Sequence, residues 1–200
     1  MAFQGPRSPQ QVISTGPGNV AWTNPQQALT SNNIPATASI NLNQTTKFLQ
    51  AVKFKFSIPT RANIWGIVVE IEKRGGAVKD NSVRSVKGGT RTGNEKAAGG
   101  FWPGTDAYVS YGGDRDLWGV GWRPSDINSN GFGAAIQAIG PDAGGIADVD
   151  HIRITVHFGS GPPPPAPAPP GAAIQTSPAN IALYKRMISV RNDRFIHIGY

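Results

Sequence analysis

Residues 101–158 constrain the fold more than any other part of the chain, because they end in a run of alternating apolar and polar side chains. Successive side chains of a strand point to opposite faces of a sheet, so this alternation is typical of a strand with one buried face. The side chains predicted to face the core are Ile152, Ile154, Val156 and Phe158, and those predicted to face outward are Arg153, Thr155 and His157. The segment has no helical period, and its glycines fall where turns or bulges need a permissive backbone. It therefore predicts a protein built from sheets.

Two earlier segments repeat the alternation. Residues 48–58 predict a strand with Val52, Phe54, Phe56 and Ile58 on its buried face, and residues 62–73 one with Trp65, Ile67, Val69 and Ile71 there. Further strands are expected at residues 36–42, 81–87, 108–111, 131–138 and 146–158, and a polar loop at 90–100. Roughly seven or eight short strands without a long helical pattern predict an all-β fold, and we expect an antiparallel, jelly-roll-like β-sandwich.

Proline and glycine divide the chain into four predicted parts. Residues 1–18 carry several prolines among polar side chains, which favours an extended N-terminal arm. Residues 19–159 hold the sandwich, with Trp22 as an anchor near its start. Residues 160–171 are a Pro-rich linker, expected to be extended and semi-rigid. Residues 172–200 follow as a C-terminal assembly arm that is too short for a core of its own.

The C-terminal arm is predicted to pair with another chain or with a copy of the same chain. Two apolar runs flank the turn-forming pair Asn192 and Asp193, which indicates a hairpin, and a lone hairpin is only marginally stable in water. The expected assembly contacts are Leu183, Lys185, Arg186, Ile188, Val190, Arg191, Arg194, Phe195, Ile196 and Ile198. The arm therefore predicts a homo-oligomer or attachment to other subunits.

Composition narrows the classes of partner. The 200 residues contain no Cys, which excludes disulfides and thiolate metal sites, and a single core is expected. The N-terminus does not have the pattern of a secretory signal and no apolar run has the length of a membrane span, so we expect synthesis in a cytoplasm without membrane insertion. The net charge of +7 favours an acidic partner. Nucleic acid is the less favoured partner, because the basic residues are scattered singly.

Candidate catalytic and metal-binding residues each have a simpler interpretation. Glu70 and Glu72 share a face, but the pattern places them on the solvated side beside Lys73 and Arg74. Four aspartates could offer oxygen ligands to Ca²⁺ but do not form a dense calcium loop: Asp114, Asp116, Asp148 and Asp150. The three histidines, His151, His157 and His197, do not have the spacing of a zinc site. No Ser-His-Asp arrangement is recognisable. We therefore expect no catalytic residues, no metal and no cofactor.

Five aromatic residues near glycines are the candidate ligand surface: Trp102, Tyr108, Tyr111, Trp118 and Trp122. Flat aromatic faces beside polar loops can bind sugars, and jelly rolls are found in lectins. The alternative, which we favour, is that these rings seal the end of the core.

An ordered series of short motifs resembles a domain of virion structural proteins of tailed bacteriophages and their prophage relatives. The motifs are AWTNP (21–25), FSIP (56–59), IVVEIE (67–72), VRSVK (83–87), TDAYVSYGG (105–113), DLWG (116–119), IN with GFG (127–133) and VDHIRI (149–154). They span residues 19–158. The resemblance implies a jelly-roll-like sandwich in a particle protein of either the head or the tail.

Two functions are consistent with these patterns. The first is a non-enzymatic structural protein of a bacteriophage particle, a capsid decoration protein anchored to capsid or tail subunits through its extended termini. The second is a carbohydrate- or receptor-binding module of a tail fibre or baseplate, with a surface glycan as its partner. Either function predicts a protein of the virion that is made in the host cytoplasm.

Overall fold

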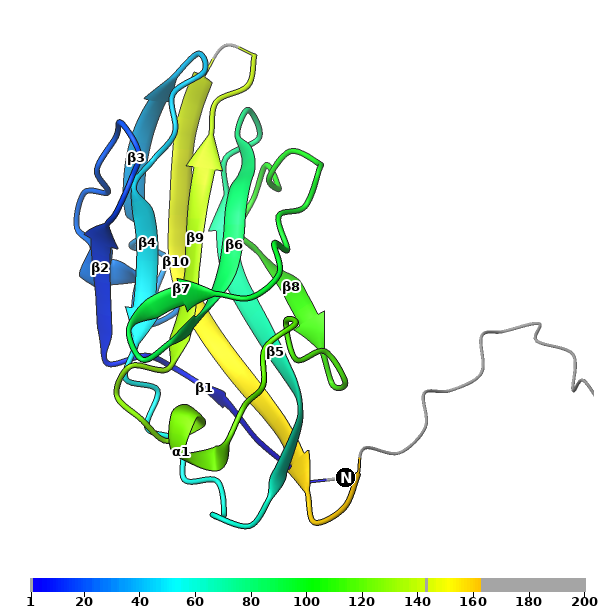
Figure 1. Ribbon diagram of the computed structural model, residues 1–200. Coiled ribbons are helices and arrows are strands. Elements are labelled where there is room, and N and C mark those ends of the chain that lie inside the picture. Colours follow the sequence, from blue (N-terminus) through cyan, green and yellow to red (C-terminus); the bar gives the residue numbers. More distant parts are fainter. Residues whose placement is uncertain (1, 143, 163–200) are drawn as a thin grey trace, which may run out of the picture. The chain divides into compact units, whose positions relative to one another are not determined.

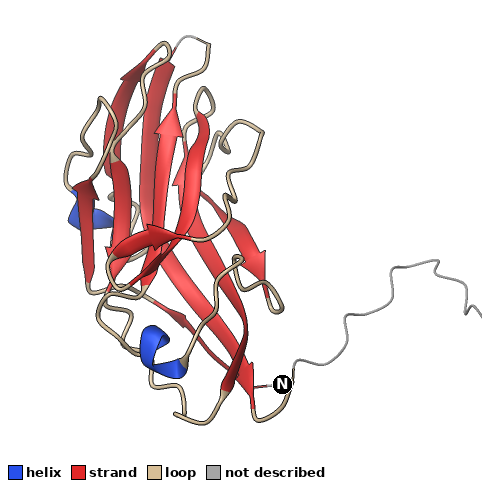
Figure 2. Ribbon diagram, viewed as in Figure 1, coloured by secondary structure: helices blue, strands red, loops and turns tan. Residues whose placement is uncertain are grey.

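The protein is a sandwich of two antiparallel five-stranded sheets (Figures 1 and 2). The computed structural model describes residues 2–142 and 144–162. The strands are β1 (Ala2–Arg7), β2 (Gln11–Thr15), β3 (Ala36–Asn41), β4 (Phe48–Val52), β5 (Asn63–Arg74), β6 (Lys79–Lys87), β7 (Thr90–Thr92), β8 (Ala107–Gly113), β9 (Gly133–Ile139) and β10 (Gly144–Gly159). Two one-turn helices, η1 (Pro25–Ala28) and α1 (Pro124–Ile127), lie in connections. The predicted all-β sandwich is therefore confirmed.

The long strand β10 organises the first sheet. It pairs with β5 along most of its length, with β3 near its start and with β1 near its end, and β8 closes the far edge of β5. Ile152, Ile154 and Val156 are fully buried, as their alternation predicts. The second sheet has the order β2-β4-β9-β6-β7. The inner faces of the two sheets enclose the main core.

The N-terminal residues are part of the sandwich, so the predicted extended arm is wrong. β1 pairs with β10 in the first sheet and β2 pairs with β4 in the second, and Val12 lies in the core. Pro6 does not prevent this, because β1 is an edge strand, where a missing N–H donor is tolerated, and Pro9 lies in the connection between β1 and β2. One short segment thus contributes to both sheets.

The predicted strand of residues 48–58 is regular only as far as Val52. Lys53 and Lys55 have positive φ angles of 65° and 55°, which break the ladder. Phe54, Phe56 and Ile58 are nevertheless buried, and Phe54 and Phe56 pack against Phe132. Phe54, Phe56 and Ile58 thus reach the main core as predicted, although along irregular backbone, whereas Val52 lies in a separate apolar cluster with Phe48. Within β4 the residues that face the main core are Leu49 and Ala51, so the prediction is wrong for Val52.

A charged cluster lies between the sheets, formed by Lys73, Asp80, Trp102 and Tyr111. Lys73 Nζ is 2.5 Å from Asp80 Oδ1, and the two side chains are 2% and 0% exposed. The Trp102 indole and the Tyr111 hydroxyl both donate to the same carboxylate, at 2.7 and 2.8 Å. Lys73 was expected beside Glu72 on the solvated face, but it continues the inward face of β5 after Ile71. That expectation is wrong, because the interior supplies a counter-ion and hydrogen-bond partners.

Within the described residues, no helix is long and apolar enough to cross a membrane.

Candidate functional site

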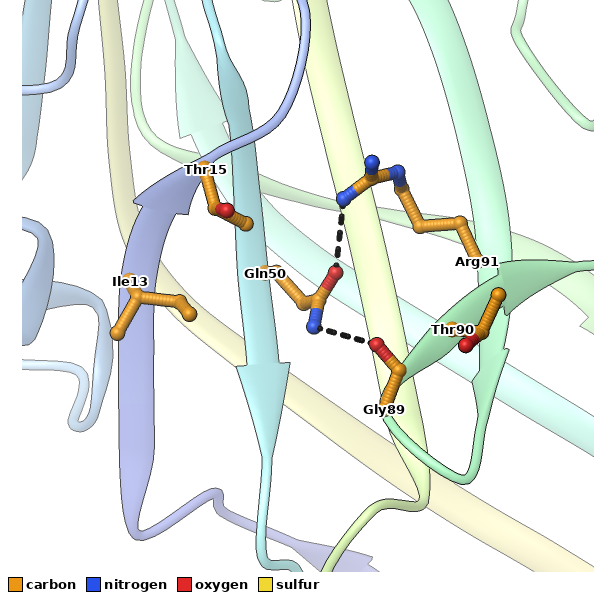
Figure 3. A pocket seen from close by; sticks show the side chains of 6 residues that line it. All are labelled: Ile13, Thr15, Gln50, Gly89, Thr90 and Arg91. Carbon is orange, nitrogen blue, oxygen red and sulfur yellow. Dashed lines mark hydrogen bonds between the residues drawn. The ribbon is translucent and has the colours of Figure 1, made fainter.

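A polar hollow of about 400 Å³ lies on the outer face of the second sheet. Its lining comes from three separate parts of the chain, which Figure 3 shows together: Ile13, Thr15, Gln50, Gly89, Thr90 and Arg91. Gln50 on β4 forms the floor, β2 lies on one side, and the turn and strand after β6 lie on the other (Figure 3). The hollow is therefore bounded by both edge strands of this sheet.

The β6–β7 hairpin can reach this position because two glycines form its turn. Gly88 and Gly89 have φ angles of 59° and 83°, as a two-residue hairpin turn with left-handed residues requires. The N–H of Gly89 donates to the carbonyl of Gly131 at 2.8 Å. A Cβ on Gly131 would lie 2.7 Å from the backbone nitrogen of Gly89, so only glycine permits this approach. The turn is thus fixed to the loop that precedes β9.

The Arg91 guanidinium is fixed by contacts on two sides. Its Nη1 donates to Gln50 Oε1 at 3.0 Å, and its Cζ lies 4.4 Å from the centre of the Phe48 ring. Gln50 is itself fixed, because its Nε2 donates to the carbonyl of Gly89 at 3.2 Å. Phe48 belongs to a small apolar cluster on the outer face of the sheet, with Val52, Val86 and Ala135. The cation therefore has a defined place above an apolar base.

The lining of the hollow offers one cation, two hydroxyl groups and an apolar side chain. Arg91 is the only charged residue in the lining, Thr15 and Thr90 carry hydroxyls, and Ile13 is 37% exposed. The lining contains no carboxylate, histidine or lysine that could act as a general acid or base. It can donate hydrogen bonds and attract negative charge.

Four of the five aromatic residues of the predicted ligand surface lie in the interior. Trp102, Tyr111, Trp118 and Trp122 are between 0% and 8% exposed. Trp118 shows how this is achieved: its backbone N–H donates to Asp116 Oδ1 at 2.7 Å and its indole donates to the carbonyl of Ile67 at 3.0 Å. These rings are therefore not available as a sugar platform, because the loops that carry them fold inward.

Tyr108, the fifth aromatic residue, is half-buried on the outer side of the first sheet and is part of a polar chain. Its hydroxyl lies 2.8 Å from His151 Nδ1, and the Ser8 hydroxyl lies 2.9 Å from His151 Nε2. Arg153 stacks at 3.8 Å over the Tyr108 ring. Burial lowers the pKa of His151 below its ordinary value, which favours the neutral ring. The partner of Nδ1 is thus a phenol rather than the carboxylate of a Ser-His-Asp triad, and the contacts tie the N-terminal segment to β10.

The acidic candidates are held in separate contacts. Both carboxylate oxygens of Glu70 accept from Arg153, at 2.9 and 3.0 Å. Asp116 is 2.6 Å from Lys96 Nζ, and Asp148 accepts from Thr37 and Arg74. Asp150 accepts from the backbone of residues 32 and 33, whereas Asp114 is exposed. Among the described residues, no group of three or more His, Cys, Asp or Glu side chains could hold a metal ion.

The ten predicted assembly residues of the C-terminal arm, from Leu183 to Ile198, lie outside the described residues, and so does most of the Pro-rich linker.

Comparisons of the chain with protein-family models, with curated proteins and with solved structures found no match.

The hollow has no recognisable motif in the sequence. Its residues are small or polar, come from distant segments and form no motif, and residues 90–100 were expected to be a loop without a strand. The available signal was the pair Gly88 and Gly89 after the predicted strand of residues 81–87, since adjacent glycines indicate a tight hairpin. That hairpin brings Thr90 and Arg91 toward β4.

Proposed function

We propose that the protein is a non-enzymatic structural protein of a bacteriophage particle, most specifically a capsid decoration protein anchored through its C-terminal extension. One observation carries the proposal: the chain from Ala2 to Gly159 builds both sheets and the core. The Pro-rich linker and the C-terminal arm are therefore not needed to close the sandwich, and we assign to them the binding of other subunits. Because β1 and β2 belong to the sandwich, the proposed anchor is at the C-terminal end alone.

Exposed apolar side chains at one end of the sandwich support an assembly role. Leu42, Phe101 and Ile146 are 53%, 47% and 57% exposed. Leu42 follows the end of β3, Ile146 lies at the start of β10, and Phe101 forms a β-bridge with Lys79 at the start of β6. These ends of β3, β6 and β10 lie at one end of the sandwich (Figure 1). Exposed apolar residues that gather in one region mark interaction surfaces, and the net charge of +7 favours an acidic neighbour such as a shell surface.

The position of the protein on the particle tests this proposal. Gold-labelled antibodies against residues 1–162, applied to purified particles, should mark the head surface in electron micrographs. Particles made without the C-terminal arm, residues 172–200, should lose the label. Absence of the protein from purified particles would contradict the proposal.

A second candidate is a carbohydrate- or receptor-binding module of a tail fibre or baseplate. The hollow beside Arg91 favours it, since a fixed guanidinium with neighbouring hydroxyls can bind a polar ligand. Labelling at the tail tip instead of the head would support this candidate.

A further inference from the structure

We propose that the hollow over β4 binds an acidic saccharide, with the sugar carboxylate paired to Arg91. The inference deepens the second candidate function and rests on it. It moves the ligand site from the aromatic loops to the outer face of the second sheet, where Figure 3 shows the residues concerned.

Charge selects the class of ligand. Arg91 is the only charged group in the lining, so a bound anion would not meet a carboxylate there. An arginine carries five N–H donors, and Gln50 is the single hydrogen-bond acceptor found for Arg91 in the part of the chain that the structure describes. Donors therefore remain for a ligand, and a guanidinium matches the planar geometry of a carboxylate.

The rest of the lining suits a sugar ring better than a simple anion. Thr15 and Thr90 offer hydroxyls on the two sides of the hollow, and each can donate and accept a hydrogen bond. Ile13 presents an apolar side chain on the β2 side, against which the C–H face of a pyranose can pack. A volume of about 400 Å³ is within the range of small-molecule sites.

The site is preorganised. Phe48 and Gln50 hold the guanidinium in place, and a Cβ on Gly16 would lie 2.6 Å from Arg91 Nη2, so the residue that follows β2 also lies close to it. Binding then requires little ordering of the arginine, which reduces the entropic cost.

Glucuronate and glucose form the matched pair of probes, because they differ only in the carboxylate. Titrating each into the full-length, ¹⁵N-labelled protein should shift the backbone amide signals of Thr15, Gly89 and Thr90 with glucuronate, at concentrations where glucose shifts them little. Replacing Arg91 by Ala should weaken glucuronate binding by about tenfold or more, the effect of losing a charge-assisted hydrogen bond. Arg61→Ala is the control, because it removes the same charge from an exposed turn before β5.

Thr15→Val and Arg91→Lys separate the parts of the proposal. Thr15→Val should weaken glucuronate binding while leaving acetate binding unchanged, and Arg91→Lys should retain only part of the affinity. Equal shifts with glucose and glucuronate, or equal affinity of Arg91→Ala and Arg61→Ala, would overturn the proposed pairing. If acetate bound as tightly as glucuronate, the site would be a carboxylate site without sugar recognition, and the saccharide assignment would fail. A sugar that binds without shifting these amides would leave the second candidate function intact and refute the site.

Discussion

Asp80 is the carboxylate at the centre of the charged cluster between the sheets. It accepts from Lys73, Trp102, Tyr111 and the backbone N–H of Ala98. Burial lowers the pKa of Lys73, although Asp80 acts in the opposite direction, and burial together with the Asp80 charge raises the pKa of Tyr111. The cluster therefore depends on all of its members, since a charge left alone in the interior is strongly destabilising.

Asp80→Ala is expected to lower the free energy of unfolding by about 3–5 kcal/mol, because it leaves the Lys73 ammonium buried without a counter-ion. The double variant Lys73→Met with Asp80→Ala should be less destabilised than Asp80→Ala alone. Urea denaturation followed by tryptophan fluorescence measures both. Arg84→Ala is the surface control: its pair with Glu95 is more than a third exposed on both sides, so a loss below about 1 kcal/mol is expected. Additive effects of the two interior substitutions would contradict this account.

His151 predicts a pH dependence of stability near neutrality. Burial lowers its pKa from the ordinary 6.5, and burial also lowers the pKa of His157. As the pH falls through the ordinary value, the unfolded chain therefore binds more protons than the folded one. The two histidines thus lower stability as the pH falls through that range and contribute no pH dependence well above it. Each site can contribute a slope of at most about 1.4 kcal/mol per pH unit.

Urea midpoints between pH 7.5 and 5.5 should fall in the natural chain and fall less in His151→Gln, whatever the effect of that substitution at pH 7.5. His157→Gln is the comparison variant, because His157 is also partly buried, and this substitution should also reduce the fall of the urea midpoint between pH 7.5 and 5.5. If the urea midpoint fell as much in the double variant, His151→Gln with His157→Gln, as in the natural chain, the pH dependence would belong to other groups.

At the scale of elements, β1 and β2 show what pattern reasoning cannot recover. Alternation predicted β5 and β10, because each has a row of apolar side chains on its inner face. The N-terminal strands have few such residues, with Pro6 inside β1 and Pro9 between the two strands. They are stabilised by pairing with β10 and β4, which are distant in sequence. The hollow was missed for the same reason: its lining joins residues 13–15, 50 and 89–91 through tertiary contacts alone.

Two neighbouring residues on β2 test whether the N-terminal segment is structural. Val12 is 5% exposed and lies in the core, whereas Ile13 is 37% exposed and faces out. Val12→Ala should lower the free energy of unfolding by about 1–2 kcal/mol through lost burial and a residual cavity. Ile13→Ala should change it by less than about 0.5 kcal/mol, as is usual for surface positions. Equal small effects in thermal and urea unfolding would restore the interpretation of this segment as an arm.

At the scale of the molecule, we expect the sandwich and the C-terminal extension to have separate tasks. The carbonyl of Gly161 accepts from Trp65 Nε1 and Asn63 Nδ2, so contacts of the sandwich continue just past the end of β10. All strands and the buried cluster found in residues 2–142 and 144–162 lie before that residue. Stability is thus expected to reside in residues 1–162, and attachment in the residues that follow.

A chain that ends at residue 162 should therefore unfold at the same temperature and urea concentration as the full chain, because it keeps both sheets and the Gly161 contacts. It should also fail to sediment with purified particles, whereas the full chain should sediment with them. A chain that ends at residue 155 is the contrasting truncation: it removes Val156 and the last β10 pairs with β1 and β5, and it should be unfolded or insoluble. Calorimetry and co-sedimentation separate the two properties. Loss of stability in the chain ending at residue 162 would show that the extension packs on the sandwich. Retained particle binding by that chain would instead place the anchor on the sandwich itself, and the exposed apolar residues Leu42 and Ile146 would then be the surface to mutate.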